Sequence, residues 1–139
     1  MIFTLSLLFA ATVTPCNGDK GTFVPETIFF PDELPIGQKS GFSAYGNFTK
    51  LITGGTITAK VWKGFLNVYT EVNNICDKTT CPLVGQMAIA SDISIPQTFA
   101  ATYRLVLDFV DQDKEKIACF QVPLKLVESN LFDLNDLNE

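Results

Sequence analysis

Short segments rich in Val, Ile, Thr and Phe, separated by turn residues, run through most of this 139-residue chain. β-Branched and aromatic residues favour strands, and several short strands with turns between them are typical of a β-sandwich. No stretch before the last dozen residues has a useful helical period. Strands are predicted over residues 22–30, 41–48, 56–62, 65–72, 86–93, 102–110 and 116–127. The length leaves room for one core, so we expect one all-β sandwich of about seven strands.

Apolar and polar residues alternate within these segments, and the alternation assigns their side chains to two faces. In the last two strands the inward face carries Tyr103, Leu105, Leu107, Phe109, Phe120, Val122, Leu124 and Leu126. In the hairpin around Lys63-Gly64 the inward residues are Ile57, Ala59, Val61, Leu66 and Val68, and the outward residues are Lys60, Asn67 and Glu71. Further inward aromatic residues are expected at Phe99 and at one or more of Phe29, Phe42 and Phe48. Periodicity fits both a packed core and a sandwich that is hollow between its sheets.

The segments between the predicted strands have turn compositions. Residues 31–35, with a proline at each end, are expected as a turn, and so is the polar run 111–114. Trp62 and Phe65 flank the Lys63-Gly64 turn on its outer face. There they either meet a membrane or partner surface or pack as a cross-strand aromatic pair.

Four cysteines allow three pairings. Cys76 and Cys81 flank a short polar loop and can close it locally, which leaves Cys16 for Cys119. Two disulfides in a small chain indicate an oxidising compartment. A zinc site is the rival interpretation, but the chain has no His and no Cys-x-x-Cys pair, so it is disfavoured.

Both ends of the chain differ from the middle. Residues 1–12 are apolar and too short to span a bilayer, so they are interpreted as a signal peptide with cleavage near Ala11 or Thr12, the alternative being a hydrophobic first strand. Asn47-Phe48-Thr49 is a glycosylation acceptor sequence, which predicts a surface position for Asn47. Residues 128–139 form an acidic tail, with a short amphipathic helix as the alternative to a frayed end. A secreted protein, or one in the endosomal or lysosomal lumen, is expected.

The net charge and the amino-acid composition argue against several classes of function. The net charge is −5 with no basic cluster, which argues against nucleic acid as a partner. Without His, neither a Ser-His nor a Cys-His catalytic pair can exist. Asp111 and Asp113 are a carboxylate pair in sequence, but a polar turn predicts that both are solvated. We therefore expect no enzyme and no cofactor.

Three stretches of the chain resemble the ML lipid-recognition domain family. They are Cys76 to Cys81 with Pro82-Leu83 after them, Ile95-Pro96, and the run Cys119-Phe120-Gln121-Val122-Pro123-Leu124-Lys125-Leu126. The proline-rich segment at residues 31–37 is similar to the family's first crossover, and Ile52-Thr53-Gly54-Gly55 to the entry of its third strand. The resemblance covers residues 16–127 and is nearest to the Niemann–Pick type C sterol-carrier branch and to phosphatidylglycerol/phosphatidylinositol transfer proteins.

This resemblance implies an immunoglobulin-like sandwich whose sheets hold a sterol or a phospholipid tail in an apolar cavity between them. The implied role is a secreted or lumenal lipid-transfer protein, monomeric, with transient membrane contact and with a lumenal sterol transporter or receptor as a further partner. Together with the inward faces, it predicts lipid contacts for Val61, Leu66, Phe99, Tyr103, Leu105, Leu107, Phe109, Phe120, Val122 and Leu124.

Two departures from the family pattern concern the cavity and its ligand. The additional disulfide of the animal sterol carrier is missing, and Phe99-Ala100-Ala101 replaces the usual Pro-Gly before the sixth predicted strand. Two alternatives remain: a lipid-sensing accessory module of a receptor, and an immunoglobulin-like interaction domain without ligand.

Overall fold

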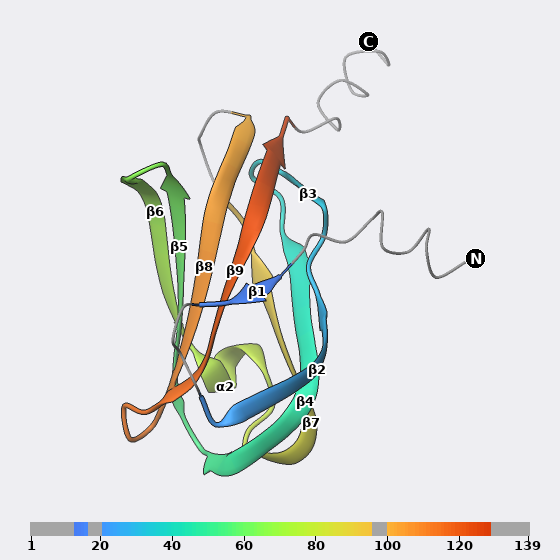
Figure 1. The fold of residues 1–139 in the computed structure, drawn as a ribbon, viewed down its shortest axis with the longest axis vertical. Coiled ribbons are helices and arrows are strands. Elements are labelled where there is room, and N and C mark those ends of the chain that lie inside the picture. Colours follow the sequence, from blue (N-terminus) through green and yellow to red (C-terminus); the bar gives the residue numbers. More distant parts are fainter. Residues whose placement is uncertain (1–12, 17–20, 96–99, 129–139) are drawn as a thin grey trace, which may run out of the picture.

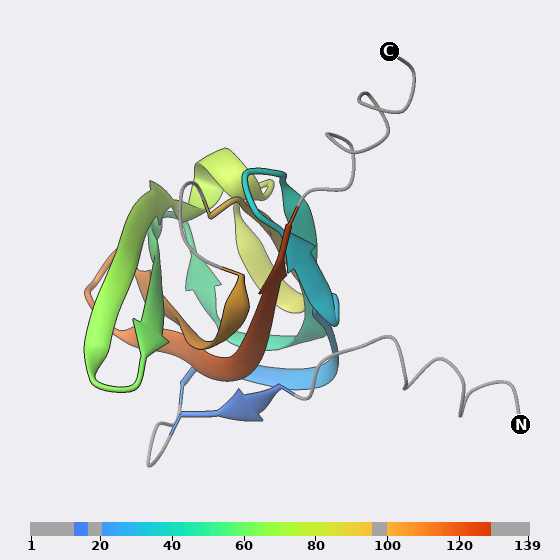
Figure 2. The same cartoon turned by 90° about the horizontal axis from the view of Figure 1, so that it is seen from above.

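The computed structural model describes residues 13–16, 21–95 and 100–128. Two antiparallel β-sheets lie face to face, and seen from above their strands surround a common interior (Figures 1 and 2). The larger sheet contains, in spatial order, β1 (Thr14–Pro15), β9 (Lys116–Val127), β8 (Ala101–Asp111), β5 (Gly55–Lys63) and β6 (Leu66–Asn74), with β3 (Glu33–Pro35) parallel to β9. The smaller sheet contains β2 (Phe23–Phe29), β4 (Ser40–Ile52) and β7 (Leu83–Ile93). A single helical turn, α2 (Ile75–Lys78), follows β6 and leads toward β7.

All seven predicted strands are present, and β4, β6 and β7 extend further than their sequence patterns indicated. The sequence missed β1 and β3, because two or three residues are too few to show a period. Residues 31–35 were expected to be only a turn, which is wrong for Glu33–Pro35, since these residues pair with the end of β9. The predicted signal peptide at residues 1–12 and the tail beyond Glu128 lie outside the described residues.

The predicted inward faces of β8 and β9 are confirmed. Leu105 pairs with Val122, and Leu107 pairs with Phe120. Every second residue from Tyr103 to Phe109 and from Phe120 to Leu126 is buried. The alternation succeeds here because each strand keeps an unbroken two-residue period over the core.

A β-bulge between Val61 and Trp62 overturns the predicted faces of β6. Beyond the bulge Val61 pairs with Tyr69 and Ala59 with Glu71. A one-residue shift moves every following side chain to the other face. Leu66, predicted to point inward, precedes the bulge and pairs with Lys63 at the tip of the hairpin, where it is 65% exposed. Val68, the residue that the bulge leaves unpaired, is exposed as well. Glu71, predicted to point outward, lies on the same face as buried Ala59.

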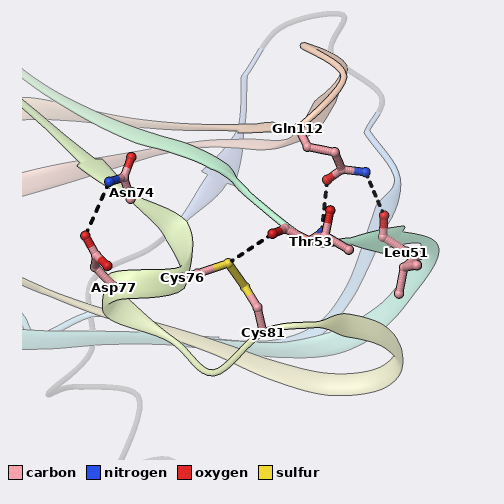
Figure 3. The surroundings of a disulfide bond; sticks show 7 residues. All are labelled: Leu51, Thr53, Asn74, Cys76, Asp77, Cys81 and Gln112. Carbon is pink, nitrogen blue, oxygen red and sulfur yellow. Dashed lines mark hydrogen bonds between the residues drawn. A yellow bond between two sulfur atoms is a disulfide. The ribbon is translucent and has the colours of Figure 1, made fainter.

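Both predicted disulfides are present. Cys16 is bonded to Cys119 and joins the segment of β1 to β9. Cys76 is bonded to Cys81 and closes the loop that begins in α2 (Figure 3).

Near the Cys76–Cys81 bridge, one side chain fastens the β4–β5 connection to the β8–β9 hairpin. Gln112 accepts a hydrogen bond from the backbone N–H of Thr53 at 3.0 Å and donates one to the carbonyl of Leu51 at 3.1 Å (Figure 3). This end of the sandwich is therefore held by side-chain hydrogen bonds as well as by the bridge. Within the described part of the chain, no helix has the length and apolarity needed to cross a membrane.

Candidate functional site

A narrow cleft runs between the two sheets on the side where β6 and β7 form their edges. Its lining comes from both sheets: Phe30, Phe42, Ile57, Ala59, Glu71, Asn73, Ser91, Asp92, Ile93 and Leu107. The cavity left open in it has a volume of about 10 Å³. That is room for about one water molecule. The sheets are thus closed on each other here, and a larger occupant requires them to separate.

Phe30 and Phe42 line this cleft, and Phe109 and Phe120 pack against Phe42 behind it. The ring of Phe42 lies 6.0 Å from Phe30, 6.1 Å from Phe109 and 6.0 Å from Phe120, measured between centroids. Phe109 and Phe120 make an edge contact at 6.0 Å. Such contacts stabilise aromatic clusters by about 0.5–1.5 kcal/mol per pair beyond the area they bury. The cluster connects the cleft to the inward faces of β8 and β9.

The structure places the predicted site residues in three groups. Leu107 lines the cleft. The buried residues behind or beside it are Val61, Tyr103, Leu105, Phe109, Phe120, Val122 and Leu124. Leu66 does not belong to the site, because it lies exposed at the tip of the β5–β6 hairpin, and Phe99 lies outside the described residues.

Sequence reasoning missed several lining residues. Phe42 and Phe48 are buried as expected for part of the Phe29, Phe42, Phe48 set, but Phe29 is half exposed and its neighbour Phe30 is buried instead. Alternation at Phe42, Ala44 and Phe48 was an available signal for β4. No pattern signalled the polar residues of β6, since their position depends on the bulge.

Glu71 and its neighbours make a hydrogen-bonded polar patch in the cleft wall. The Tyr69 hydroxyl donates to Glu71 Oε1 at 2.9 Å, and Asn73 Nδ2 donates to Glu71 Oε2 at 2.6 Å. Burial and then the hydrogen bond to Glu71 raise the pKa of Tyr69. The phenol is therefore neutral and remains a donor at physiological pH.

Asp92 stands across the cleft on β7. Its carboxylate accepts a hydrogen bond from Lys78 Nζ at 2.9 Å and lies 3.7 Å from Lys39 Nζ. The bond from Lys78 holds the pKa of Asp92 below its ordinary value. Asp92, Ser91 and Phe42 also border a wider open hollow of about 590 Å³ on the surface, so the cleft meets the solvent here.

A second charged cluster joins the two sheets at the β8–β9 hairpin. Lys50 of β4 lies 3.0 Å from Asp111, 2.9 Å from Asp113 and 2.7 Å from Glu115. Hydrogen bonds to Glu115, Asp113 and Asp111, in that order, raise the pKa of Lys50. Asp111 was expected to be solvated, which is wrong, because its side chain is fully buried beneath Lys50. Burial alone would raise the pKa of Asp111, but the N–H of Glu115, Lys50 and the N–H of Asp113 together hold it below the ordinary value.

The β5–β6 hairpin carries exposed apolar side chains. Phe65 is fully exposed, and Leu66 beside it is mostly exposed. Trp62 is half-buried, with the guanidinium of Arg104 5.5 Å from its ring centroid. Of the two expected outer aromatic residues, only Phe65 presents its whole side chain to the surroundings.

Comparisons with known proteins agree with this architecture. The ML domain family matches residues 10–126. A protein of Dictyostelium discoideum, named as a candidate phosphatidylglycerol/phosphatidylinositol transfer protein, is 27% identical over 135 residues, which are 91% of this chain and 96% of that protein.

Two solved structures show the same fold. The Niemann-Pick type C2 protein from the Japanese carpenter ant superposes with a TM-score of 0.64 at 18% identity, over 84% of this chain and 99% of that one. Chicken MD-1, solved in complex with lipid IVa, superposes with a TM-score of 0.55 at 11% identity, over 81% of this chain and 86% of that one. The predicted immunoglobulin-like sandwich is confirmed.

Proposed function

Because this chain belongs to the ML domain family, we propose that it binds a sterol or a phospholipid tail between its sheets and carries it between membranes. The names of its relatives support this role, since one is named for phospholipid transfer and another was solved with a lipid. The observation that carries the proposal is the phenylalanine-walled cleft between the sheets. The function needs no chemical step, and no catalytic residue is proposed.

Lipid entry requires the cleft to widen. β6 and β7 are the edges of their sheets on this side, and the connection between them is the short segment of α2 and the Cys76–Cys81 loop. The same end of the sandwich is also held by Lys50, which joins β4 to the β8–β9 hairpin (Figure 1). We infer that the sheets part at the β6–β7 side while the Lys50 end keeps them in register.

Burial of the lipid supplies free energy for such an opening. Burying roughly 400 Å² of apolar ligand at about 25 cal/mol/Å² gives about 10 kcal/mol before costs. Lost ligand freedom and the work of separating the sheets reduce this figure. The lipid is held in water and is released at a membrane, where its apolar part is equally well solvated.

Phe65 supplies the membrane contact in this proposal. An exposed phenylalanine next to an exposed leucine, on a hairpin tip, can enter the interface of a bilayer without any change of fold. The two disulfides indicate a secreted or lumenal protein, which fits transfer between membranes outside the cytosol. A monomer suffices for this function, with a lumenal sterol transporter or receptor as a further partner.

One observation favours a second candidate function. The open volume in the cleft is only about 10 Å³, which suits an interaction domain with a filled core. Lipid extraction of the protein purified from a secreting eukaryotic host, followed by mass spectrometry, separates the two. Lipid transfer predicts near-stoichiometric sterol or phospholipid. Absence of any lipid, together with no uptake of fluorescent sterol or phospholipid, would leave the interaction domain.

A further inference from the structure

The inner face of β6 is polar at the point where it borders an apolar cleft. Glu71 lies directly opposite Ala59, and Asn73 lies opposite Ile57. Both side chains line the same cleft as Phe30 and Phe42. A carboxylate beside aromatic walls is costly unless it receives hydrogen bonds, so its placement calls for an explanation in terms of what the cleft holds.

Three side chains around the cleft, Tyr69, Asn73 and Ser91, donate hydrogen bonds to protein acceptors. Tyr69 and Asn73 both donate to Glu71, at 2.9 and 2.6 Å. The Ser91 hydroxyl donates to the carbonyl of Asp92 at 3.2 Å. A carboxylate can accept about four hydrogen bonds, and an amide oxygen two. The free capacity of Glu71 and the carbonyl oxygen of Asn73 therefore present acceptors to a ligand.

The charge of this wall is negative, and the nearest cation acting on Glu71 is Lys78, which is bound to Asp92 across the cleft and whose pKa Glu71 helps to raise. Among residues 13–16, 21–95 and 100–128, no Lys or Arg lies within ion-pair distance of Glu71, whereas Asp92 has both Lys78 and Lys39. A phosphate or sulfate placed against Glu71 would meet a like charge at low local dielectric, and its acceptor oxygens would face the carboxylate oxygens of Glu71. A hydroxyl placed there would donate to Glu71.

We propose that Glu71 and Asn73 make the cleft selective for neutral lipids with a hydroxyl at their polar end, and against lipids with a phosphate or sulfate at that end. This selectivity rests on the proposed lipid binding and names the ligand class that the site takes. It arises from the β5–β6 bulge, which turns Glu71 toward the cleft.

The test compares lipids with the same apolar body and different heads. Cholesterol is paired with cholesteryl sulfate, and dioleoylglycerol with dioleoylphosphatidic acid, each radiolabelled and presented from cyclodextrin at pH 7. Dissociation constants are measured for the wild type, for Glu71→Gln and for Glu26→Gln. Glu26 is an exposed acid of β2, so its variant removes the same charge away from the cleft. Thermal unfolding verifies that all three proteins are folded.

The wild type is expected to bind the hydroxyl member of at least one pair about tenfold or more tightly than its anionic partner. Glu71→Gln should narrow that ratio several-fold, and Glu26→Gln should leave it unchanged. Equal affinity for both heads, or a preference that survives in Glu71→Gln, overturns the selectivity while lipid binding stands. Uptake of none of the four lipids overturns the proposed function itself.

Discussion

Lys50 and Asp111 form an ion pair of 3.0 Å that connects the smaller sheet to the larger one, with the Asp111 side chain fully buried. Asp111 also accepts backbone hydrogen bonds from Asp113 at 2.8 Å and Glu115 at 3.0 Å. One carboxylate thus fixes both the hairpin turn and the spacing of the sheets. This cluster holds one end of the sandwich closed, whereas the cleft lies along the β6–β7 side.

The Lys50–Asp111 pair predicts a defined pH dependence of stability. Asp111→Asn removes the charge, and we expect it to lower the free energy of unfolding at pH 7 by about 1–3 kcal/mol. The folded pKa of Asp111 lies below its ordinary value of 3.8, so its contribution is present above that pH and is lost as pH falls through the folded pKa. In urea unfolding at several pH values, the difference in the free energy of unfolding between Asp111→Asn and the wild type should become smaller below pH 3.8. A difference that stays constant down to pH 2 would contradict this assignment.

The two disulfides should differ in their contribution to stability. Cys16 and Cys119 are 103 residues apart in sequence, whereas Cys76 and Cys81 are 5 apart. Loop-entropy arguments give about 4.7 kcal/mol for a 100-residue loop and much less for a short one. Replacing Cys16 and Cys119 by Ala should therefore lower the melting temperature more than replacing Cys76 and Cys81. Equal losses in calorimetry would show that loop length does not govern their effect.

Filling the cleft should block lipid uptake without unfolding the protein. Ala59 lines the cleft and is buried, so Ala59→Leu occupies space that a lipid needs. Overpacking costs about 1–3 kcal/mol. Ala44→Leu is the matched control, because Ala44 is a buried alanine of β4 that does not line the cleft. We expect uptake of a fluorescent sterol or phospholipid to fall in Ala59→Leu only. Similar uptake by both variants would place the lipid elsewhere.

Phe65 should govern membrane contact. Phe65→Ser is expected to weaken sedimentation with phosphatidylcholine vesicles while changing the free energy of unfolding by less than about 0.5 kcal/mol, because the side chain is fully exposed. Val84→Ser is the control, since Val84 is a half-exposed apolar residue at the start of β7. Equal vesicle binding by the two variants would assign the contact to another surface.

The sequence predicted best where a strand keeps its period over the core. β8 and β9 show their faces by alternation alone, since every second residue of each strand is buried over the core. The pairing of the four cysteines was predicted from their spacing. Cys76 and Cys81 are 5 residues apart and can close a local loop, which leaves Cys16 to pair with Cys119.

The features that the sequence did not predict, such as the face of Glu71 and the burial of Asp111, depend on tertiary geometry. A bulge at Val61/Trp62 leaves no mark in composition, yet it places Glu71 on the face that lines the cleft. Asp111 resembled a solvated turn residue because its partner, Lys50, is 61 positions away in the chain. Long-range pairs of this kind are set by how the two sheets pack, which a periodic pattern does not encode.

The most direct measurement is photocrosslinking with diazirine-bearing sterol and diacyl lipids, followed by mapping of the adducts by peptide mass spectrometry. A lipid held between the sheets should label the cleft wall, in particular Phe42, Ile93 and Leu107. Labelling should decrease in Ala59→Leu and compete with unlabelled lipid. Adducts confined to exposed side chains such as Phe65 and Phe29, with the cleft wall unlabelled, would contradict the central claim that lipid lies between the two sheets.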